Sequence, residues 1–469
     1  MTKLIKPVIV GAGPAGIRAA QTLVAHGLRP TVIDESVKWG GQIYRQQPGN
    51  FSRTAKQIYG FEAGRADAVL TAMRSLLPQV DYRPNTLVWN AEGGQLDLLN
   101  DGQTSVIDFT DIIIATGATD RILPFKGWTL PGVFSLGGAQ VALKFQGCAI
   151  GKKVVFAGTG PLLYLVAFQY AKAGANVVAI LDSSRLSLQV KALPALLNQP
   201  VVLAKGMYYV AWLKAQGIAI HNDASPMQAS GAHGVEKLIW RNSQGDHTLD
   251  CDAIATGYGL RSESQLADIL DCKFVFVNSD NAWMPQKDQV GRSTQAHVYL
   301  AGDGSGIQGA DAAEWAGELA GLALIEDRHI ESKANHSLRV RQLTHQLQKR
   351  QAFGYGLNTA FQDPKSWARQ TTDDVVICRC EEITAGDIRT SVQATGAQDL
   401  NRLKAMCRVG MGRCQGRMCG PAATEILADC TQQSVQLVGR LRGQAPIKPI
   451  PFVQSPATNA NGANTKAAA

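Results

Sequence analysis

The sequence predicts an α/β fold built from two similar halves, followed by a small helical domain. A strand runs into a glycine-rich turn at residues 8–16, and a similar pattern returns at residues 154–160. Five of the nine cysteines then lie between residues 378 and 419. Because a repeated strand–turn–helix–strand unit is typical of dinucleotide-binding domains, we expect two Rossmann-like domains in one chain.

The first glycine-rich stretch has the spacing of a phosphate-binding turn. It reads Val-Ile-Val-Gly-Ala-Gly-Pro-Ala-Gly, so a buried strand leads directly into G-x-G-x-x-G. In this motif Gly11 allows the turn, Gly13 admits a pyrophosphate, and Gly16 lets the next helix pack on the strand. The pyrophosphate would lie on the open amides of the helix that starts near Pro14 and Ala15, where the helix dipole favours negative charge.

An acidic pair follows the second strand at the distance that a nucleotide site requires. Residues 30–33 form this strand, which ends in Asp34 and Glu35. An acid about twenty residues after the glycines is suited to ribose hydroxyls. The alternative, an ordinary β–α turn, does not explain the distant acid. We also expect Gly41 and Gln42 to belong to a loop that closes over the bound nucleotide.

Two further segments are expected to return the chain to the nucleotide. A strand at residues 86–89 brings Val88 to the site, and a buried strand at 111–115 ends in the small-residue turn Thr116-Gly117. The elements between them are expected to be a helix over residues 64–77 and a hairpin over residues 95–110.

The second unit departs from the motif. Gly158 and Gly160 end a buried strand, and the following strand ends in Asp182, as in the first unit. Leu163 occupies the position of the third glycine, so the helix cannot approach the strand as closely. Two interpretations remain open, namely a second nucleotide site at Gly158 and Gly160, or a domain kept for packing alone.

A last buried strand, residues 298–303, ends in Gly302 and Asp303. The helix from about 310 to 324 follows it, and its amino end at Gly309–Asp311 could direct the helix dipole at a flavin ring that carries negative charge. Beyond it we expect a basic amphipathic helix over residues 331–352, with Leu338, Leu343 and Leu347 on its apolar face, and a tail that is disordered or lies on a partner.

Length and composition favour a multidomain protein of the cytoplasm. The chain has 469 residues, of which 45% are hydrophobic and 18% charged. The first strand starts within ten residues of Met1, so we expect no signal peptide, and no apolar run is long enough for a transmembrane segment. A peripheral position at the inner membrane face remains an option. Nine cysteines without an export signal indicate a reducing compartment.

The net charge of +8 lies entirely in the last third of the chain. Residues 331–469 contain 18 Lys and Arg against 10 Asp and Glu, whereas the first 330 residues contain 28 of each. Docking of an acidic partner and a solvated basic face are equally compatible with this excess. No motif for nucleic-acid binding accompanies it, because aromatic residues are not interleaved with the basic ones.

Four cysteines form a candidate metal centre, and two kinds of centre are compatible with them. The pattern is C-x-C, 33 residues, then C-x4-C. Four thiolates suit a [2Fe–2S] cluster or a tetrahedral zinc ion, although zinc ribbons generally use C-x2-C. Cys407 is interpreted as a packing thiol, with replacement of one ligand as the alternative. The four candidate ligands are Cys378, Cys380, Cys414 and Cys419.

Residues around the cysteines fit an anionic centre. Glycines free backbone amides to hydrogen-bond sulfur, and nearby arginines would offset the thiolate charge. The glycines are Gly410, Gly412, Gly416 and Gly420, and the arginines are Arg379, Arg408, Arg413 and Arg417.

The sequence provides no signal for a catalytic acid, base or nucleophile. No C-x-x-C lies near either Ala-Thr-Gly turn, which argues against a flavin–dithiol disulfide reductase. The eight histidines are scattered and form no metal-binding or nucleophile–base motif. We therefore predict ligands to cofactors and no catalytic residue in this chain.

These motifs resemble two known families. The first glycine loop, Ala115-Thr116-Gly117 and Ala301-Gly302-Asp303 resemble flavoproteins with two dinucleotide-binding domains, of the glutathione and thioredoxin reductase type. The resemblance implies that the first loop and its acid hold the ADP half of FAD and that Asp303 bonds the ribityl chain. The run 410–420, together with Cys378-Arg-Cys380-Glu, is similar to the bacterioferritin-associated-ferredoxin-type (BFD-like) [2Fe–2S] domain.

The combination resembles the α (A) subunit of heteromeric flavin-dependent amine dehydrogenases, over roughly residues 5–440. This group includes opine oxidase/dehydrogenase, D-hydroxyproline dehydrogenase and hydrogen cyanide synthase. The resemblance implies a catalytic β subunit with its own FAD, a small ferredoxin-like γ subunit in some members, and room for FMN at the subunit contact. It implies that this chain relays electrons from the β-subunit flavin to an acceptor while a secondary amine or amino acid is oxidised.

Two other functions remain open at this point. An NAD(P)H-dependent flavoprotein reductase with an iron–sulfur cluster would use the second domain for nicotinamide, and Leu163 argues against it. A zinc-stapled scaffold would use the nucleotide for stability alone. The expected domains are residues 1–120 with 290–330 for FAD, 121–289 for the second dinucleotide domain, 331–371 for a helical linker, 372–443 for the BFD-like domain and 444–469 for a disordered tail.

Overall fold

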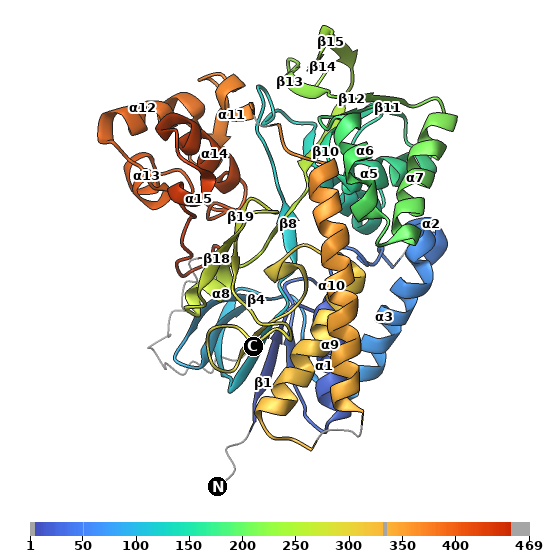
Figure 1. Cartoon of the computed structure of the whole chain (residues 1–469), viewed down its shortest axis with the longest axis vertical. Helices are drawn as coiled ribbons and strands as arrows, with labels where there is room; N and C mark the ends of the chain where they lie inside the picture. Colours follow the sequence, from blue (N-terminus) through green and yellow to red (C-terminus); the bar gives the residue numbers. More distant parts are fainter. Residues whose placement is uncertain (1–4, 50, 332–334, 365, 452–469) are drawn as a thin grey trace, which may run out of the picture.

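The computed structural model describes residues 5–49, 51–331, 335–364 and 366–451. Two α/β domains lie one above the other, and a small helical domain packs beside them (Figure 1). A long helix, α10, runs beside both α/β domains (Figure 1). The predicted fold class is confirmed by this arrangement.

The first domain is built on a five-stranded parallel sheet in the order β20-β7-β1-β2-β3. Its central strands are buried on both faces, because helices cover one face and an antiparallel sheet the other. The sheet strands are β1 (Pro7–Val10), β2 (Thr31–Ile33), β3 (Asp81–Arg83), β7 (Asp111–Ile114) and β20 (Val298–Leu300), the helices are α1 (Pro14–Ala25), α3 (Ala63–Leu76) and α9 (Ala310–Asp327), and the antiparallel strands are β4 (Thr86–Glu92), β5 (Gln95–Asn100) and β6 (Gln103–Asp108).

The second domain repeats this plan. Its parallel sheet has the order β12-β11-β10-β16-β9, so that β16-β10-β11-β12 corresponds to β7-β1-β2-β3 of the first domain. An antiparallel sheet, β13-β14-β15, again follows in the chain. The bounds are β9 (Val133–Ser135), β10 (Val154–Thr159), α5 (Pro161–Lys172), β11 (Val177–Asp182), α6 (Leu186–Leu196), α7 (Pro200–Ala215), β12 (Ala219–Asn222), β13 (Ser225–Ser230), β14 (Lys237–Asn242), β15 (Gly245–Asp250) and β16 (Ala253–Tyr258).

The second domain ends earlier than the predicted boundary at residue 289. The helix α8 (Gln265–Ile269) contributes Leu266 and Ala267 to the apolar core of the first domain, together with Cys272. Strand β17 (Leu260–Ser262) pairs with β8 (Ala118–Asp120), so the two crossings between the domains run side by side. The chain therefore returns to the first domain after β16, because the apolar side chains of α8 complete that core.

The linker helix α10 (His336–Ala360) is longer than predicted and starts later. Its face toward α9 carries Val340, Leu343 and Leu347. The prediction that Leu338 shares this face is wrong, since its side chain is 56% exposed. Five residues separate it from Leu343, which places the two about 140° apart around a helix with 3.6 residues per turn. At its other end α10 packs against α6.

Three longer helices and two short ones, α11 (Trp367–Gln370) and α15 (Val435–Val438), surround a short hairpin and form the C-terminal domain. A capping box between Thr384 and Asp387 starts the first of the longer helices, with both reciprocal hydrogen bonds present. Their apolar faces form one core, to which Cys378 and Cys419 also belong. The elements are β21 (Val376–Cys378), β22 (Ile383–Thr384), α12 (Ala385–Thr395), α13 (Leu400–Cys407) and α14 (Gly420–Thr431).

Residues 444–451 do not behave as the disordered tail that the composition predicted. The Ile447 side chain is buried in the core of the first domain, and its amide donates to the Trp89 carbonyl at 2.9 Å. The burial of Ile447 and the hydrogen bonds of its backbone hold this short segment on the first domain, which the proline- and alanine-rich composition did not indicate. The rest of the predicted tail, 452–469, lies outside the described residues.

Candidate cofactor sites

The first glycine loop joins β1 to α1 where larger side chains do not fit. Gly11 has a φ of +110°, and its amide donates to the Ile33 carbonyl at 2.7 Å. A Cβ at Gly11 would lie 2.2 Å from the Ala115 carbonyl oxygen, and one at Gly16 would lie 1.8 Å from the Gly11 carbonyl oxygen. Pro14 is the first residue of α1, and no side chain caps this helix end. Its first amides therefore face the space where a phosphate would bind.

The two acids after β2 have different surroundings. Asp34 accepts hydrogen bonds from the amides of Ala12 at 2.6 Å and Ser36 at 2.7 Å, so its carboxylate shapes the glycine loop. Burial raises its pKa. Glu35 is exposed at the end of the strand and forms an ion pair with Lys448 of the C-terminal segment. Of the pair, Glu35 is the acid that a ribose could reach.

The loop at Gly40-Gly41 lies on the glycine loop. The Gly40 amide donates to the Ala12 carbonyl at 2.8 Å, and a Cβ at Gly13 would lie 3.7 Å from the Gly41 Cα. The Gln42 side chain is exposed and accepts a hydrogen bond of 2.7 Å from a neighbouring arginine.

Three predicted site residues contribute to the packing around the first glycine loop. Val88 is buried in the core of the first domain, so only its backbone can face a ligand. Gly302 has a φ of +69°, and a Cβ there would lie 2.9 Å from the Cβ of Ala15. The Ala15 carbonyl is in turn covered by Gly317 of α9, where a Cβ would lie 2.0 Å from the oxygen.

The turn at Thr116-Gly117 is held by a residue that the sequence did not indicate. The Thr116 hydroxyl donates to the Glu263 carbonyl at 2.6 Å, and the Glu263 amide donates to the Gly117 carbonyl at 3.0 Å. Nearby, Asp303 accepts the amides of Gln308 at 2.9 Å and Gly309 at 3.1 Å, while burial raises its pKa. The bare glycine surfaces, the uncapped α1 and the carboxylates of Glu35 and Asp303 together fit an extended dinucleotide.

The second unit has the corresponding glycine loop, but hydrogen bonds within the protein already occupy the carboxylate of its acid, Asp182. Asp182 accepts hydrogen bonds from the hydroxyls of Thr159 at 2.8 Å and Tyr164 at 2.6 Å, and from the Ser184 amide at 2.8 Å. A Cβ at Gly158 would lie 1.9 Å from a backbone oxygen of β16, so this glycine serves the sheet. Gly160, with a φ of +105°, lines an adjacent cavity. A ribose would have to displace the hydroxyls that hold Asp182.

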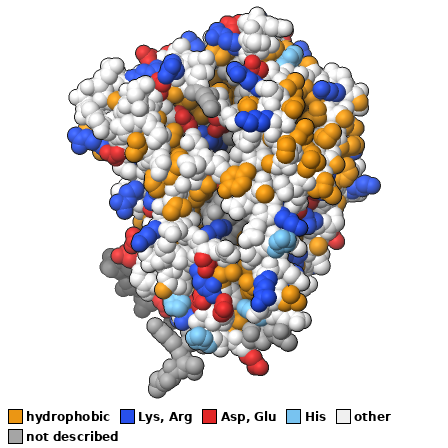
Figure 2. Space-filling model, in the orientation of Figure 1, with side chains coloured by type: hydrophobic (Ala, Val, Ile, Leu, Met, Phe, Trp, Pro, Cys, Tyr) orange, Lys and Arg blue, Asp and Glu red, His pale blue; other side chains and the backbone are white. Residues whose placement is uncertain are grey.

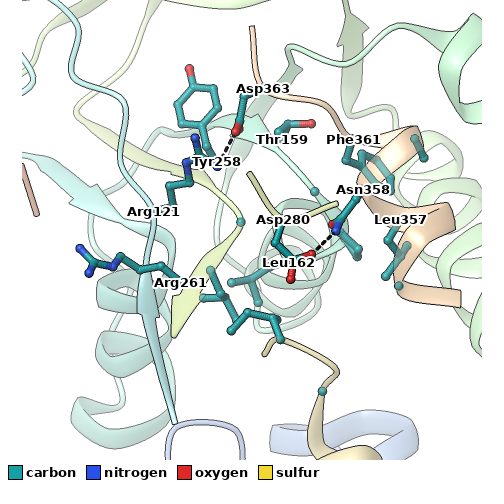
Figure 3. A pocket seen from close by; sticks show the side chains of 18 of the residues that line it. Arg121, Thr159, Leu162, Tyr258, Arg261, Asp280, Leu357, Asn358, Phe361 and Asp363 are labelled. Atoms are coloured by element: carbon teal, nitrogen blue, oxygen red, sulfur yellow. Dashed lines mark hydrogen bonds and ion pairs between the residues drawn. The ribbon is translucent and has the colours of Figure 1, made fainter. Parts of the chain in front are cut away.

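This cavity, of about 1470 Å³, extends from Gly160 to the first and C-terminal domains. Figure 3 shows Arg121 paired with Asp363, at 2.7 Å, and Asp280 facing Asn358, at 2.6 Å. Asn358 and Asp363 come from the end of α10 and the chain after it. The linker therefore lines the same cavity as the second glycine turn.

The four predicted cysteines meet in the C-terminal domain. The Cys419 thiol lies within hydrogen-bonding reach of Cys378 and Cys414, and Cys414 within reach of Cys380. Within the described ranges, however, no three His, Cys, Asp or Glu side chains converge as ligands of one metal ion. A chain of neighbouring thiols without three ligands on one point suits the two irons of a [2Fe–2S] cluster better than a single tetrahedral zinc ion. Cys407 instead packs against the domain core, as predicted.

The surroundings of the thiols favour thiolates at two positions. The amides of Gly410 and Glu381 and the Cys419 thiol lower the pKa of Cys378 to about 6. The Cys419 thiol and the amides of Met418 and Gly416 lower the pKa of Cys414 to about 5. Gly410 and Gly416 thus supply amides to sulfur, whereas the Gly420 amide donates to the Gly416 carbonyl at 2.8 Å. A Cβ at Gly412 would instead lie 2.3 Å from the Cys380 Cβ.

The cysteine loop is joined directly to the first domain. The Arg417 guanidinium, between Cys414 and Cys419, donates to both oxygens of Glu263 at 2.6 and 2.9 Å. It also donates to the Ile447 carbonyl at 2.6 Å. Arg417 therefore neutralises a carboxylate, where the sequence suggested thiolates. Arg408 likewise pairs with Glu381, and Arg379 lies over the Trp128 ring.

Comparison with known proteins identifies both parts of the chain. Residues 5–317 match the pyridine nucleotide-disulphide oxidoreductase family. The chain belongs to this family. Residues 376–429 match the BFD-like [2Fe-2S] binding domain. These matches confirm FAD and a [2Fe–2S] cluster as the cofactors and make zinc the wrong alternative for the cysteines. In the described part of the chain, none of the helices combines the length and apolarity needed to cross a membrane.

Two curated relatives extend over almost the whole chain. The A subunit of opine oxidase from Agrobacterium tumefaciens (strain Ach5) is 33% identical over 94% of this chain and 89% of the relative. The HcnB subunit of hydrogen cyanide synthase from Pseudomonas protegens is 33% identical over 96% of this chain and 97% of the relative. The crystal structure of L-proline dehydrogenase from P. horikoshii covers 96% of this chain and 78% of its own, with a TM-score of 0.70 and 19% identity.

The comparisons confirm the resemblance to subunits of flavin amine dehydrogenases and establish an oxidoreductase subunit with flavin and iron–sulfur centres. Sequence reasoning missed Glu263 and the linker side chains. Glu263 stands after a β-strand without a motif, and only the fold brings it to the Thr116 turn.

Proposed function

We propose that this chain is the electron-transferring subunit of a heteromeric dehydrogenase that oxidises a secondary amine or amino acid, of the opine or D-hydroxyproline type. The observation that supports it most is the ion pair of Arg417 and Glu263, which fixes the cysteine loop to the turn of the flavin domain. A bound flavin and a bound iron–sulfur cluster would supply the redox chemistry that links a donor of two electrons to acceptors of one electron.

The residues that would hold each cofactor follow from the geometry. The FAD pyrophosphate would lie on Gly11, Gly13 and the start of α1, with the ribose at Glu35 and the ribityl chain at Asp303. Residues from 5 to about 120 and from about 260 to 330 would form this domain. Cys378, Cys380, Cys414 and Cys419 would ligate the cluster within residues 372–443. Cys380 is exposed, so this side of the cluster would face an external electron carrier.

Substrate oxidation would belong to a partner subunit. No nucleophile–base grouping faces the cavity of Figure 3 within the described residues, and the two acids labelled there, Asp363 and Asp280, are paired with Arg121 and Asn358. The name of the opine oxidase relative favours a donor in which carbon is bonded to nitrogen. A catalytic β subunit with its own FAD would oxidise that bond, and FMN at the contact and a small γ subunit would be further components.

An apolar surface on α6 and α7 supports assembly with this partner. Figure 2 shows hydrophobic side chains gathered on the side of the molecule where these helices lie. Residues 183–222 contain four Lys or Arg and no Asp or Glu, so a partner with an apolar centre and acidic rim fits. Several of these side chains line the same cavity as Gln308–Asp311, beside the flavin end of the first domain. The α6–α7 surface comprises Leu186, Val190, Leu193, Leu197, Val201 and Met207.

The proposal is tested by purifying the tagged chain from its native host together with its partners. We expect flavin, about two irons and two sulfides per chain, and a co-purifying subunit with its own FAD. The complex should reduce an artificial dye with one of D-hydroxyproline, sarcosine, glycine or an opine, while the isolated chain should not. Oxidation of NADH by the isolated chain at rates that exceed those of the complex with every amine would contradict the proposal.

A further inference from the structure

The linker helix α10 brings one arginine to the flavin end of the first domain. This helix lies between the two segments that match known families, so neither match accounts for it. In its second half, the Nε of Arg350 donates to the Gln308 carbonyl at 2.8 Å. Gln308 directly precedes Gly309, the N-cap of α9. Arg350 thus lies at the helix end whose dipole was expected to face the flavin ring.

The Arg350 side chain packs closely against a glycine, Gly309. Gly309 has a φ of +87°, and a Cβ there would lie 3.2 Å from Nη2 of Arg350. The amides of Gln308 and Gly309 both donate to Asp303, the residue expected at the ribityl chain. Arg350 therefore stabilises the backbone that also positions Asp303.

One nitrogen of Arg350 is left without an acceptor. Its Nη1 is buried, and no described residue accepts a hydrogen bond from it. A buried donor without a partner costs on the order of 1–3 kcal/mol, so an acceptor outside the protein is expected there. Arg350 lines the central cavity with Gln308, Gly309 and Asp311. The unsatisfied nitrogen is consistent with a ligand atom in this part of the cavity.

We propose that Arg350 contacts the pyrimidine edge of bound FAD and stabilises the negative charge that this edge carries after reduction. Uptake of two electrons and one proton by a flavin leaves one negative charge on the ring, and a nearby cation lowers its free energy. The assignment goes beyond the proposed function, because it concerns only how this chain binds its own flavin. It gives α10 a role in setting the flavin potential, where the sequence suggested only a helical linker.

The charges around Arg350 are balanced so that its cation remains available. Carboxylates of Asp311, Asp303 and Glu62 attract it, Arg65 repels it, and burial lowers its pKa. Asp311 is itself paired with Arg65, and Glu62 with Lys205 at 2.5 Å. Neither carboxylate forms a salt bridge with Arg350, whose side-chain hydrogen bond from Nε ends on a backbone oxygen.

The test compares Arg350→Gln with Arg350→Lys in the full-length, FAD-loaded chain. We expect Arg350→Gln to lower the FAD midpoint potential in a spectroelectrochemical titration. It should also weaken binding of sulfite, which adds to the oxidised ring and leaves it negative, by about tenfold or more. Arg350→Lys keeps the charge but loses the planar fork, so both values should fall between wild type and Arg350→Gln.

Arg339→Gln is the matched control, since Arg339 lies on the same helix and pairs with Glu318 of α9 at 2.6 Å, exposed to solvent. It should leave both values at wild type. The cluster spectrum reports the fold in each variant. If Arg350→Gln loses FAD, a dissociation constant raised above that of Arg339→Gln supports the contact. Unchanged potential and sulfite affinity in Arg350→Gln, or equal shifts in Arg339→Gln, would overturn it. The potential and the sulfite affinity are measured on this chain alone, without a partner subunit. The test therefore stays valid if the proposed function is wrong.

Discussion

Arg417 and Glu263 form a two-bond ion pair, 2.6 and 2.9 Å long, between the cysteine loop and the flavin domain. Both side chains are about nine-tenths buried. The Glu263 backbone simultaneously holds the turn at Thr116-Gly117. Glu263 therefore contacts the cysteine loop through its side chain and the Thr116-Gly117 turn through its backbone.

Removal of the Glu263 charge tests this coupling. Glu263→Gln would leave the Arg417 guanidinium buried with a neutral partner, and breaking a buried pair in this way costs roughly 3 kcal/mol. We expect a lower free energy of unfolding and faster proteolytic release of the C-terminal domain. The exposed pair of Arg339 and Glu318 provides the comparison, since Glu318→Gln should change stability by less than about 1 kcal/mol.

The same pair predicts a pH dependence. Arg417 and Arg261 hold the pKa of Glu263 below its ordinary value of 4.5, despite burial. A depressed folded-state pKa adds stability above the unfolded pKa, and this stability is lost as the pH falls through the folded pKa. The stability difference between wild type and Glu263→Gln should therefore be constant above about pH 5 and shrink at lower pH. A difference that grew on acidification would contradict the assignment.

The glycine motif and the cysteine quartet could be read from the sequence because each is local. Gly11 and Gly16 are required by contacts within one β–α unit, and the thiol pairs lie at the ends of one small domain. Glu263 follows Thr116 by 147 residues, and Arg350 reaches Gln308 from a separate helix. Such contacts depend on how the domains and the linker pack against one another. Neither hydrophobic periodicity nor motif spacing in the sequence can therefore predict them. For the same reason, the sequence did not indicate that the second domain ends before residue 289.

The cluster ligands predict separable loss of the two cofactors. Cys414→Ser removes one of the four proposed thiolate ligands, so iron should fall from about two per chain toward zero while FAD remains. Cys407→Ser serves as the control, because Cys407 only packs against the domain core and its pKa is raised by burial. Iron and flavin are measured on the same samples. Retention of full iron by Cys414→Ser would exclude it as a ligand.

The first glycine loop predicts that a single added methyl group weakens FAD binding. In Gly11→Ala the new Cβ would lie 2.2 Å from the Ala115 carbonyl oxygen at a φ of +110°, so β7 and the loop must separate. We expect FAD affinity to fall by about tenfold or more, measured by flavin fluorescence. Gly64→Ala is the matched control, since nothing lies within 4 Å of its new Cβ. The cluster should survive in both variants.

The α6–α7 surface predicts where a charge disrupts the complex. Val190 is 65% exposed on α6, and Val106 is 54% exposed on β6 of the first domain. Val190→Asp would place a carboxylate in the apolar centre of the proposed contact, where burial without a partner costs several kcal/mol. We expect the dissociation constant for the catalytic subunit to rise by about a hundredfold, while FAD and iron contents stay unchanged. Val106→Asp makes the same change on another face, and it should leave the dissociation constant for the catalytic subunit near the wild-type value. Analytical ultracentrifugation of the purified complex separates the two outcomes, and equal weakening by both variants would place the contact elsewhere.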